Sequence, residues 1–129
     1  MFRHVAPRAA LISCALLATV VAACGGGGQS EPAPSVEADL VVTAVPSIRW
    51  DAAAYTAPAG EITVAMRNED SVRHTLVVLK DNDVVGDMEL LVRRQGDVDT
   101  GTITLEAGTY RIFCTVPGHQ NMNSELTVS

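Results

Sequence analysis

Apolar and polar residues alternate along several short stretches after residue 38, a pattern typical of β-strands. The alternation is clearest at Ile62, Val64 and Met66, and it returns at Ile112 and Cys114 after Tyr110. Because successive side chains of a strand point to opposite faces, each set would lie on one face of a sheet. The pattern predicts strands over seven segments: 39–45, 48–50, 61–68, 74–79, 100–105, 110–114 and 124–128.

Turn-forming residues separate these segments, as expected between short strands. They are Pro58, Gly60, Gly86, Gly96 and Gly108. The stretch 80–101 is the least regular, and 90–94 within it fits either a strand or a short helical turn. Seven or eight short strands in about 90 residues predict an all-β protein, a Greek-key β-sandwich.

The first 23 residues follow a different pattern. Arg3 and Arg8 precede an uncharged apolar run over 9–23, which is shorter than the roughly 20 residues that span a bilayer as a helix. The segment Val21-Ala22-Ala23-Cys24 resembles the lipobox of bacterial lipoproteins, in which the cysteine becomes the lipidated first residue. We therefore expect a lipoprotein signal peptide over 1–23 and lipidation at Cys24. An ordinary signal peptide with an incidental cysteine is the alternative.

Residues 24–37 are rich in glycine, serine and proline and have almost no apolar surface to bury. Such a segment is a flexible tether, so one folded domain is expected over 38–129. A lipid anchor at Cys24 would hold this domain at the membrane, on the extracytoplasmic face or in the periplasm.

The net charge narrows the classes of partner. Without Arg3 and Arg8, seven of the nine basic residues remain against fifteen acidic ones, a net charge of −8 for residues 24–129. This balance argues against nucleic acid, whose binding proteins are basic. An acidic surface would suit a cationic partner and would steer its approach.

Processing would also reduce the set of chemically active side chains. His4 and Cys14 leave with the signal peptide, so Cys114 is the free thiol of the domain, with His74 and His119 as its imidazoles. Taken singly, a buried cysteine, histidine or methionine is usually an ordinary core residue. Taken together, thiolate and imidazole beside the thioether of Met122 form the ligand set that selects copper, with methionine as the weak axial ligand.

Local geometry favours a meeting of these residues at one end of the domain. Val116-Pro117-Gly118-His119 fits a type II turn, in which proline fixes the first central φ and glycine supplies the positive φ that follows. Such a turn brings His119 back towards Cys114. His74 begins a predicted strand and shares a face with Leu76 and Val78, so its ring is expected to point inward.

Over residues 51–129 the chain resembles the cupredoxins, the small blue-copper proteins such as azurin, auracyanin and plastocyanin. The most specific segment is Cys114-Thr115-Val116-Pro117-Gly118-His119, followed by Met122. The other segments that carry the resemblance are Ala59-Gly60-Glu61-Ile62-Thr63-Val64, Asn68 with His74-Thr75-Leu76-Val77-Val78, Gly108-Thr109-Tyr110-Arg111-Ile112-Phe113, and Leu126-Thr127-Val128.

The resemblance implies a cupredoxin-like sandwich that binds one type 1 copper ion. It makes His74, Cys114 and His119 the equatorial ligands and Met122 the axial one. It also places Thr75 and Thr115 where the family often ties the two ligand-bearing loops together by hydrogen bonds. Two residues separate His119 from Met122, where azurin-like members usually have three or four, so Gln120 or a backbone oxygen is the alternative axial ligand.

A monomeric one-electron carrier is the expected function, with redox partner proteins docking transiently near His119. A copper enzyme would need further histidines, and a two-copper electron-entry site would need a second cysteine in the loop, so we expect no enzyme. The alternative is a protein that stores or delivers copper without redox work. A metal-free sandwich that only binds other molecules is a third reading.

Overall fold

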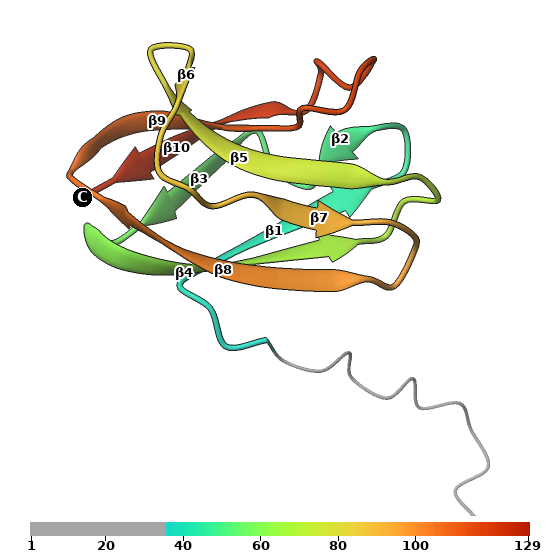
Figure 1. Cartoon of the computed structure of the whole chain (residues 1–129), viewed down its shortest axis with the longest axis horizontal. Helices are drawn as coiled ribbons and strands as arrows, with labels where there is room; N and C mark the ends of the chain where they lie inside the picture. Colours follow the sequence, from blue (N-terminus) through green and yellow to red (C-terminus); the bar gives the residue numbers. More distant parts are fainter. Residues whose placement is uncertain (1–35) are drawn as a thin grey trace, which may run out of the picture. The chain divides into compact units, whose positions relative to one another are not determined.

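The structure is a computed structural model that describes residues 36–129, and these residues form ten strands (Figure 1). The strands are β1 (Leu40–Val45), β2 (Arg49–Trp50), β3 (Ala54–Ala57), β4 (Gly60–Asn68), β5 (His74–Lys80), β6 (Asp83–Val84), β7 (Leu90–Val92), β8 (Val98–Leu105), β9 (Gly108–Phe113) and β10 (Asn123–Val128). The expected signal peptide, the lipidation site at Cys24 and nearly all of the tether lie outside the described residues. Within 36–129 no helix is long and apolar enough to cross a membrane.

The strands form two sheets that contain both parallel and antiparallel pairs (Figure 1). One sheet has the order β2-β1-β4-β8, and the other has the order β3-β10-β9-β5-β6, with β7 pairing with β5. The parallel pairs are β1 with β4 and β3 with β10, which are separated in sequence. This arrangement confirms the all-β sandwich predicted from the alternation.

All seven predicted strands are present, and each predicted boundary lies within two residues of the observed one. The undecided segment 90–94 contains a strand, Leu90–Val92, paired with the start of β5. Two further strands, β3 and β6, were not predicted. β3 (Ala-Tyr-Thr-Ala) has no apolar alternation because it lies at a sheet edge, where only the last of its four residues is buried. β6 has only two residues.

The core lies between the sheets, as the alternation predicted. On β4, Ile62, Val64 and Met66 are at most 1% exposed. Strand β5 is buried over its first five residues, from His74 to Val78. Trp50 closes the core near the start of β5, where its ring centroid lies 6.5 Å from that of His74.

Strand direction brings the sequence-distant candidate residues to one end of the sandwich. β5 and β9 are antiparallel with Val77 opposite Phe113, so the start of β5 lies beside the segment that follows β9. β10 begins at the same end, where Asn123 pairs with Phe113. The loop between β9 and β10 therefore lies at the same end of the sandwich as the start of β5 (Figure 1).

Candidate metal centre

The loop that carries three of the candidate ligands is short and closed by its own backbone. Cys114 directly follows β9, and its amide donates to the carbonyl of Met122 at 3.1 Å. The amide of His119 donates to the carbonyl of Val116 at 3.0 Å, and Gly118 has φ of 88°. This is the geometry expected of the predicted type II turn. A third bond, from the Met122 amide to the His119 carbonyl at 2.9 Å, completes the loop.

Sheet register brings His74 to this loop. His74 is the first residue of β5, and the amide of Thr75 lies 3.5 Å from Cys114 Sγ, within hydrogen-bond range for sulfur. The two residues are 39 positions apart in sequence. Their contact follows from the pairing of β5 with β9, because neighbouring strands lie about 4.8 Å apart.

His74, Cys114 and His119 converge on one point, where their ligand atoms lie within 4.8 Å of one another. Cys114 Sγ is 3.7 Å from His119 Nδ1, and the two histidine ring centroids are 5.0 Å apart. All three side chains are buried, with His119 the most exposed at 8%. A thiol and two imidazoles at this spacing form a candidate metal site. Among residues 36–129, Cys114 is the free cysteine.

The two ring nitrogens of His74 have different surroundings. Nε2 lies 3.2 Å from Asp70 Oδ2, whereas Nδ1 is buried and has no hydrogen-bond partner in the described part of the chain. A buried polar atom without a partner costs about 1–3 kcal/mol, so its presence needs an explanation. A metal ion bound at Nδ1 would provide one. Burial also lowers the pKa of His74, which favours the neutral imidazole that metal binding requires.

Asp70 is a site residue that sequence reasoning missed. Burial by itself would raise the pKa of its carboxyl group. Hydrogen bonds from the amides of Ser71 (2.7 Å) and Ile48 (3.3 Å), together with His74, outweigh burial and hold the pKa below its usual value. The carboxylate is therefore ionised and accepts the Nε2–H of His74. Such a partner fixes the tautomer of a metal-binding histidine and orients its ring.

Thr75 and Thr115 join the start of β5 to the cysteine loop. Their Oγ1 atoms are 2.7 Å apart, and Thr75 Oγ1 also accepts a hydrogen bond from the Thr115 amide at 2.8 Å. Thr75 Oγ1 lies 3.7 Å from Cys114 Sγ. These bonds cross the gap between the two ligand-bearing segments and limit their relative movement.

Replacing Thr75 by valine should lower the free energy of unfolding by about 1–2 kcal/mol, because the Thr115 amide loses its partner. Valine has nearly the same shape, so the change isolates the hydroxyl group. Urea titration of the metal-free protein measures the effect. Thr127→Val, on an exposed position of β10, is the matched control. Equal stabilities of the two variants would contradict the proposed link.

Met122 is fully buried and stands immediately before β10, so it packs against the core below the loop. Gln120, the alternative axial ligand, is exposed. The burial of Met122 is compatible with the axial role, which stays a prediction.

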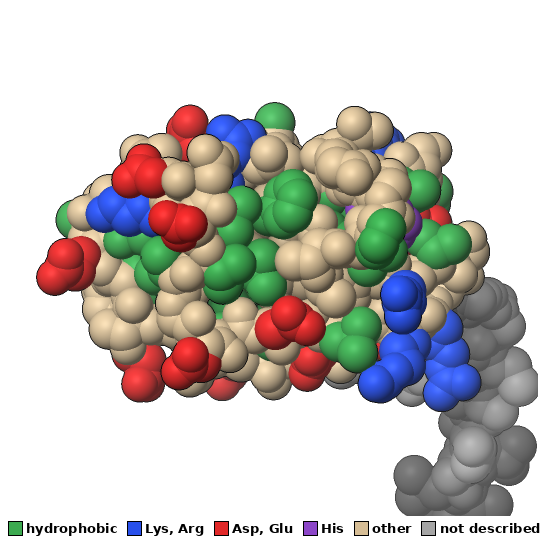
Figure 2. Space-filling view, turned by 45° about the horizontal axis from the view of Figure 1, so that its top comes forward, with side chains coloured by type: hydrophobic (Ala, Val, Ile, Leu, Met, Phe, Trp, Pro, Cys, Tyr) green, Lys and Arg blue, Asp and Glu red, His purple; other side chains and the backbone are tan. Residues whose placement is uncertain are grey.

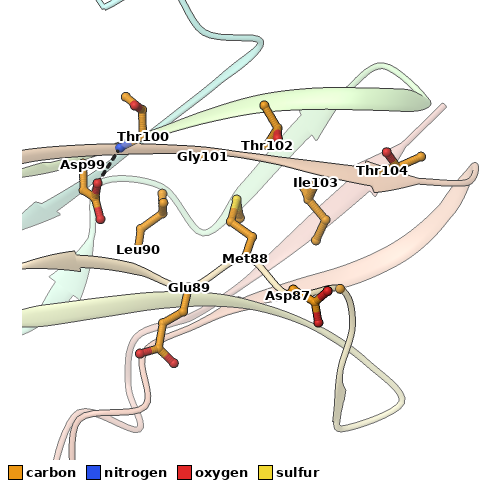
Figure 3. A pocket seen from close by; sticks show the side chains of 11 residues that line it. Asp87, Met88, Glu89, Leu90, Asp99, Thr100, Gly101, Thr102, Ile103 and Thr104 are labelled. Carbon is orange, nitrogen blue, oxygen red and sulfur yellow. Dashed lines mark hydrogen bonds between the residues drawn. The ribbon is translucent and has the colours of Figure 1, made fainter.

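A cavity of about 570 Å³ lies elsewhere, between the segment before β7 and strand β8 (Figure 3). None of the candidate ligands lines it, and both oxygens of Asp99 at its rim accept backbone bonds, from Leu91 (2.8 Å) and Thr100 (2.9 Å). The cavity is therefore separate from the candidate metal centre.

No family model and no curated protein sequence matches the chain. Solved structures do match its fold. A purple cupredoxin from Nitrosopumilus maritimus is similar with a TM-score of 0.57 and 22% identity, over 70% of this chain and 100% of that one. Auracyanin B is similar with a TM-score of 0.58 and 19% identity, over 74% of this chain and 92% of that one. A reduced Cu(I) form of an amicyanin variant is similar with a TM-score of 0.53 and 18% identity, over 75% of this chain and 88% of that one. At these identities the likeness establishes the fold.

Proposed function

We propose that this chain, which has the cupredoxin fold, binds one copper ion and carries single electrons at the cell envelope. The ligands would be His74, Cys114 and His119, with Met122 in the weak axial position. The observation that carries the proposal is the convergence of a thiol and two imidazoles, with the buried Nδ1 of His74 left without another partner. A His₂Cys set with an axial methionine favours copper over other first-row metals.

Bound copper would supply a one-electron couple between Cu(I) and Cu(II). The chain's own contribution is to hold the donors nearly still. His74 is fixed by Asp70, Cys114 by the amide of Thr75, and the 114–122 loop by its three internal backbone bonds. Because the donors are buried and held in this way, the ligand side chains would move little when the charge of the copper ion changes. A small rearrangement favours fast electron transfer.

His119 is the proposed route for electrons. His119 is 8% exposed, and the turn that carries it includes half-buried Val116 and exposed Pro117. A redox partner docking there would be weakly and briefly bound, as such encounters usually are. We further propose that a lipid on Cys24 and the tether over 24–37 keep this surface within reach of membrane-bound partners.

Optical and electron-paramagnetic spectra of the Cu(II)-loaded protein test the proposal. We expect an intense thiolate-to-copper band in the red part of the visible spectrum and a paramagnetic signal of one copper per chain. A colourless protein that binds Cu(II) only through nitrogen and oxygen would overturn it. Tight binding of Zn(II) with no stable Cu(II) form would point to a structural metal instead.

Copper storage or delivery is the competing function for the same ligands. Release to another protein is easier from exposed, methionine-rich or paired-thiol sites, whereas these ligands are at most 8% exposed. Reversible voltammetry with fast electron exchange would favour the carrier. Rapid loss of copper to a competing apoprotein would favour delivery.

Replacing Met122 by leucine should raise the reduction potential and leave the red band in place. The reason is that a weak axial sulfur donates to Cu(II) more than to Cu(I), and the potential of such sites follows the axial ligand. Voltammetry measures the shift. Met66→Leu changes an equally buried methionine on β4 and should leave the potential unchanged. Equal potentials in the two variants would remove Met122 from the axial role.

A further inference from the structure

Arginines gather at the metal-binding end of the domain. In the β5–β7 pair, His74 lies opposite Val92, so Arg73 and Arg93 extend from neighbouring positions just beyond that pair. Arg94 follows directly, and all three side chains are exposed. Figure 2 shows blue side chains gathered beside the green surface that surrounds the visible histidine.

The guanidinium groups of this cluster remain available to a partner. Arg94 has an 86% exposed side chain, and its ion pair with Asp97 is long, at 3.6 Å. Asp97 Oδ2 accepts the backbone amides of Arg93 and Arg94, which fixes the turn that presents the two side chains. The buried carboxylate at this end, Asp70, is occupied by His74 and backbone amides.

Acidic residues lie mainly elsewhere. Glu61, Asp81, Asp83 and Glu106 are exposed around the opposite end of the sandwich, beyond Lys80 at the end of β5. In Figure 2, red side chains predominate at the end away from the histidine. β5 has seven residues, so at about 3.3 Å per residue its ends are roughly 20 Å apart. That distance exceeds the Debye length of about 8 Å at physiological ionic strength, so the groups at the metal end set the field there: the three arginines, together with exposed Glu69 and the carboxylates of Asp70 and Asp97.

An apolar surface lies beside the arginines. Val72 is 39% exposed, Pro117 is exposed, and Val116 is half-buried next to the edge of His119. A small apolar centre with a charged rim is the usual anatomy of a protein–protein interface. Arginine suits such a rim because its planar fork binds carboxylates with two parallel hydrogen bonds.

We propose that Arg73, Arg93 and Arg94 form a docking rim for an acidic redox protein, which places its carboxylates on the arginines and its redox centre against the edge of His119. This inference rests on the proposed function and specifies the chemistry of the partner. It reverses the partner charge that the net charge of −8 favours, because most of the exposed acidic side chains lie away from the electron route.

The test compares an acidic and a basic probe of similar size, reduced cytochrome b5 and reduced cytochrome c. In either case one electron would pass from Fe(II) haem to Cu(II), giving Fe(III) haem and Cu(I). With the acidic probe we expect a rate that falls as salt is added. The double change Arg73→Glu and Arg93→Glu should lower that rate by about tenfold at low salt, because rim charges act mainly on association.

Lys80→Glu is the control for position, since it reverses a charge at the end of β5 that lies away from Arg73. It should leave the rate with cytochrome b5 unchanged. The visible spectrum of each variant checks that the copper centre is intact. The proposal is wrong if the rate with cytochrome b5 is the same in the arginine variant as in the unchanged protein. It is also wrong if cytochrome c reacts faster and its rate likewise falls as salt is added.

Binding measured by amide chemical shifts separates this inference from the proposed function, because it needs no electron transfer. Arginine-dependent shifts around His119 without electron transfer would support the docking rim and overturn the carrier. Electron transfer that does not depend on the arginines would support the carrier and overturn the docking rim. If the arginine variants lose binding to phosphatidylglycerol vesicles but bind cytochrome b5 as before, the surface is a lipid contact and the proposal is wrong.

Discussion

Replacing Cys114 by serine should abolish the red absorption band of the Cu(II)-loaded protein completely, since the band needs a thiolate bound to copper. Cys114 is 1% exposed and lies 3.7 Å from His119 Nδ1. A serine hydroxyl stays protonated near neutral pH and is a hard donor, so affinity for Cu(I) should fall as well. The absorption spectrum and a Cu(I) competition titration measure the two effects.

A second cysteine expected in the processed chain supplies the matched control. Cys24→Ser removes the other cysteine expected after processing, and it should leave the red band at full intensity. The same variant should abolish lipid attachment, which mass spectrometry of the membrane fraction detects. A red band that survives in Cys114→Ser would overturn the assignment of Cys114 as a copper ligand. A metal-free binding module would bind other molecules as before after that change.

Replacing Asp70 by alanine should lower the free energy of unfolding of the metal-free protein by about 2–4 kcal/mol. The carboxylate accepts hydrogen bonds from His74 Nε2 and from the amides of Ile48 and Ser71, and alanine would leave these donors without that partner. For a domain of this size the loss corresponds to a decrease in Tm of roughly 10–25 °C. Urea titration and thermal unfolding measure it.

The same change should weaken copper binding by about 10- to 100-fold, the usual effect of removing a carboxylate that orients a metal-bound histidine. Without Asp70, the proton of His74 is no longer held on Nε2, and Nδ1 is no longer kept free as a donor. Asp70→Asn is the graded variant, since its amide oxygen can still accept the Nε2–H, and it should recover part of both losses.

Asp97→Ala is the control for this prediction. Asp97 also accepts two backbone amides, but it is partly exposed, so water can replace it. Its effect on stability should stay below about 1 kcal/mol, and copper affinity should not change. If Asp70→Ala is no more harmful than Asp97→Ala, Asp70 has no role in holding His74.

Much of the fold was predictable because it depends on local pattern. Alternation with a period of two residues located β4, β8 and β9 to within two residues, since one face of each strand is buried. The Pro117-Gly118 pair predicted the turn that returns His119, because proline and glycine restrict φ without help from distant residues. β3 escaped prediction because its pairing with β10 supplies the stability that its own side chains do not.

The chemical composition of the candidate site was also set by the sequence. Over the described residues the chain offers one set of thiol and imidazole groups, Cys114 with His74 and His119, and a thiol with two imidazoles is typical of a metal site. Their actual convergence depends on the register of β5 against β9, which pairs residues 32 to 36 positions apart.

The tertiary structure determined features that neither the local hydrophobic pattern nor the net charge contains. Asp70 contacts His74 because the loop between β4 and β5 turns its carboxylate inward, where amides from two segments hold it. Likewise, a net charge is a sum without position: the chain is acidic overall, yet strand pairing sets Arg73 beside Arg93 at the metal end. The sequence thus determined which groups are present, and long-range packing determined which of them meet, because contacts between distant segments exist only once the sheets have formed.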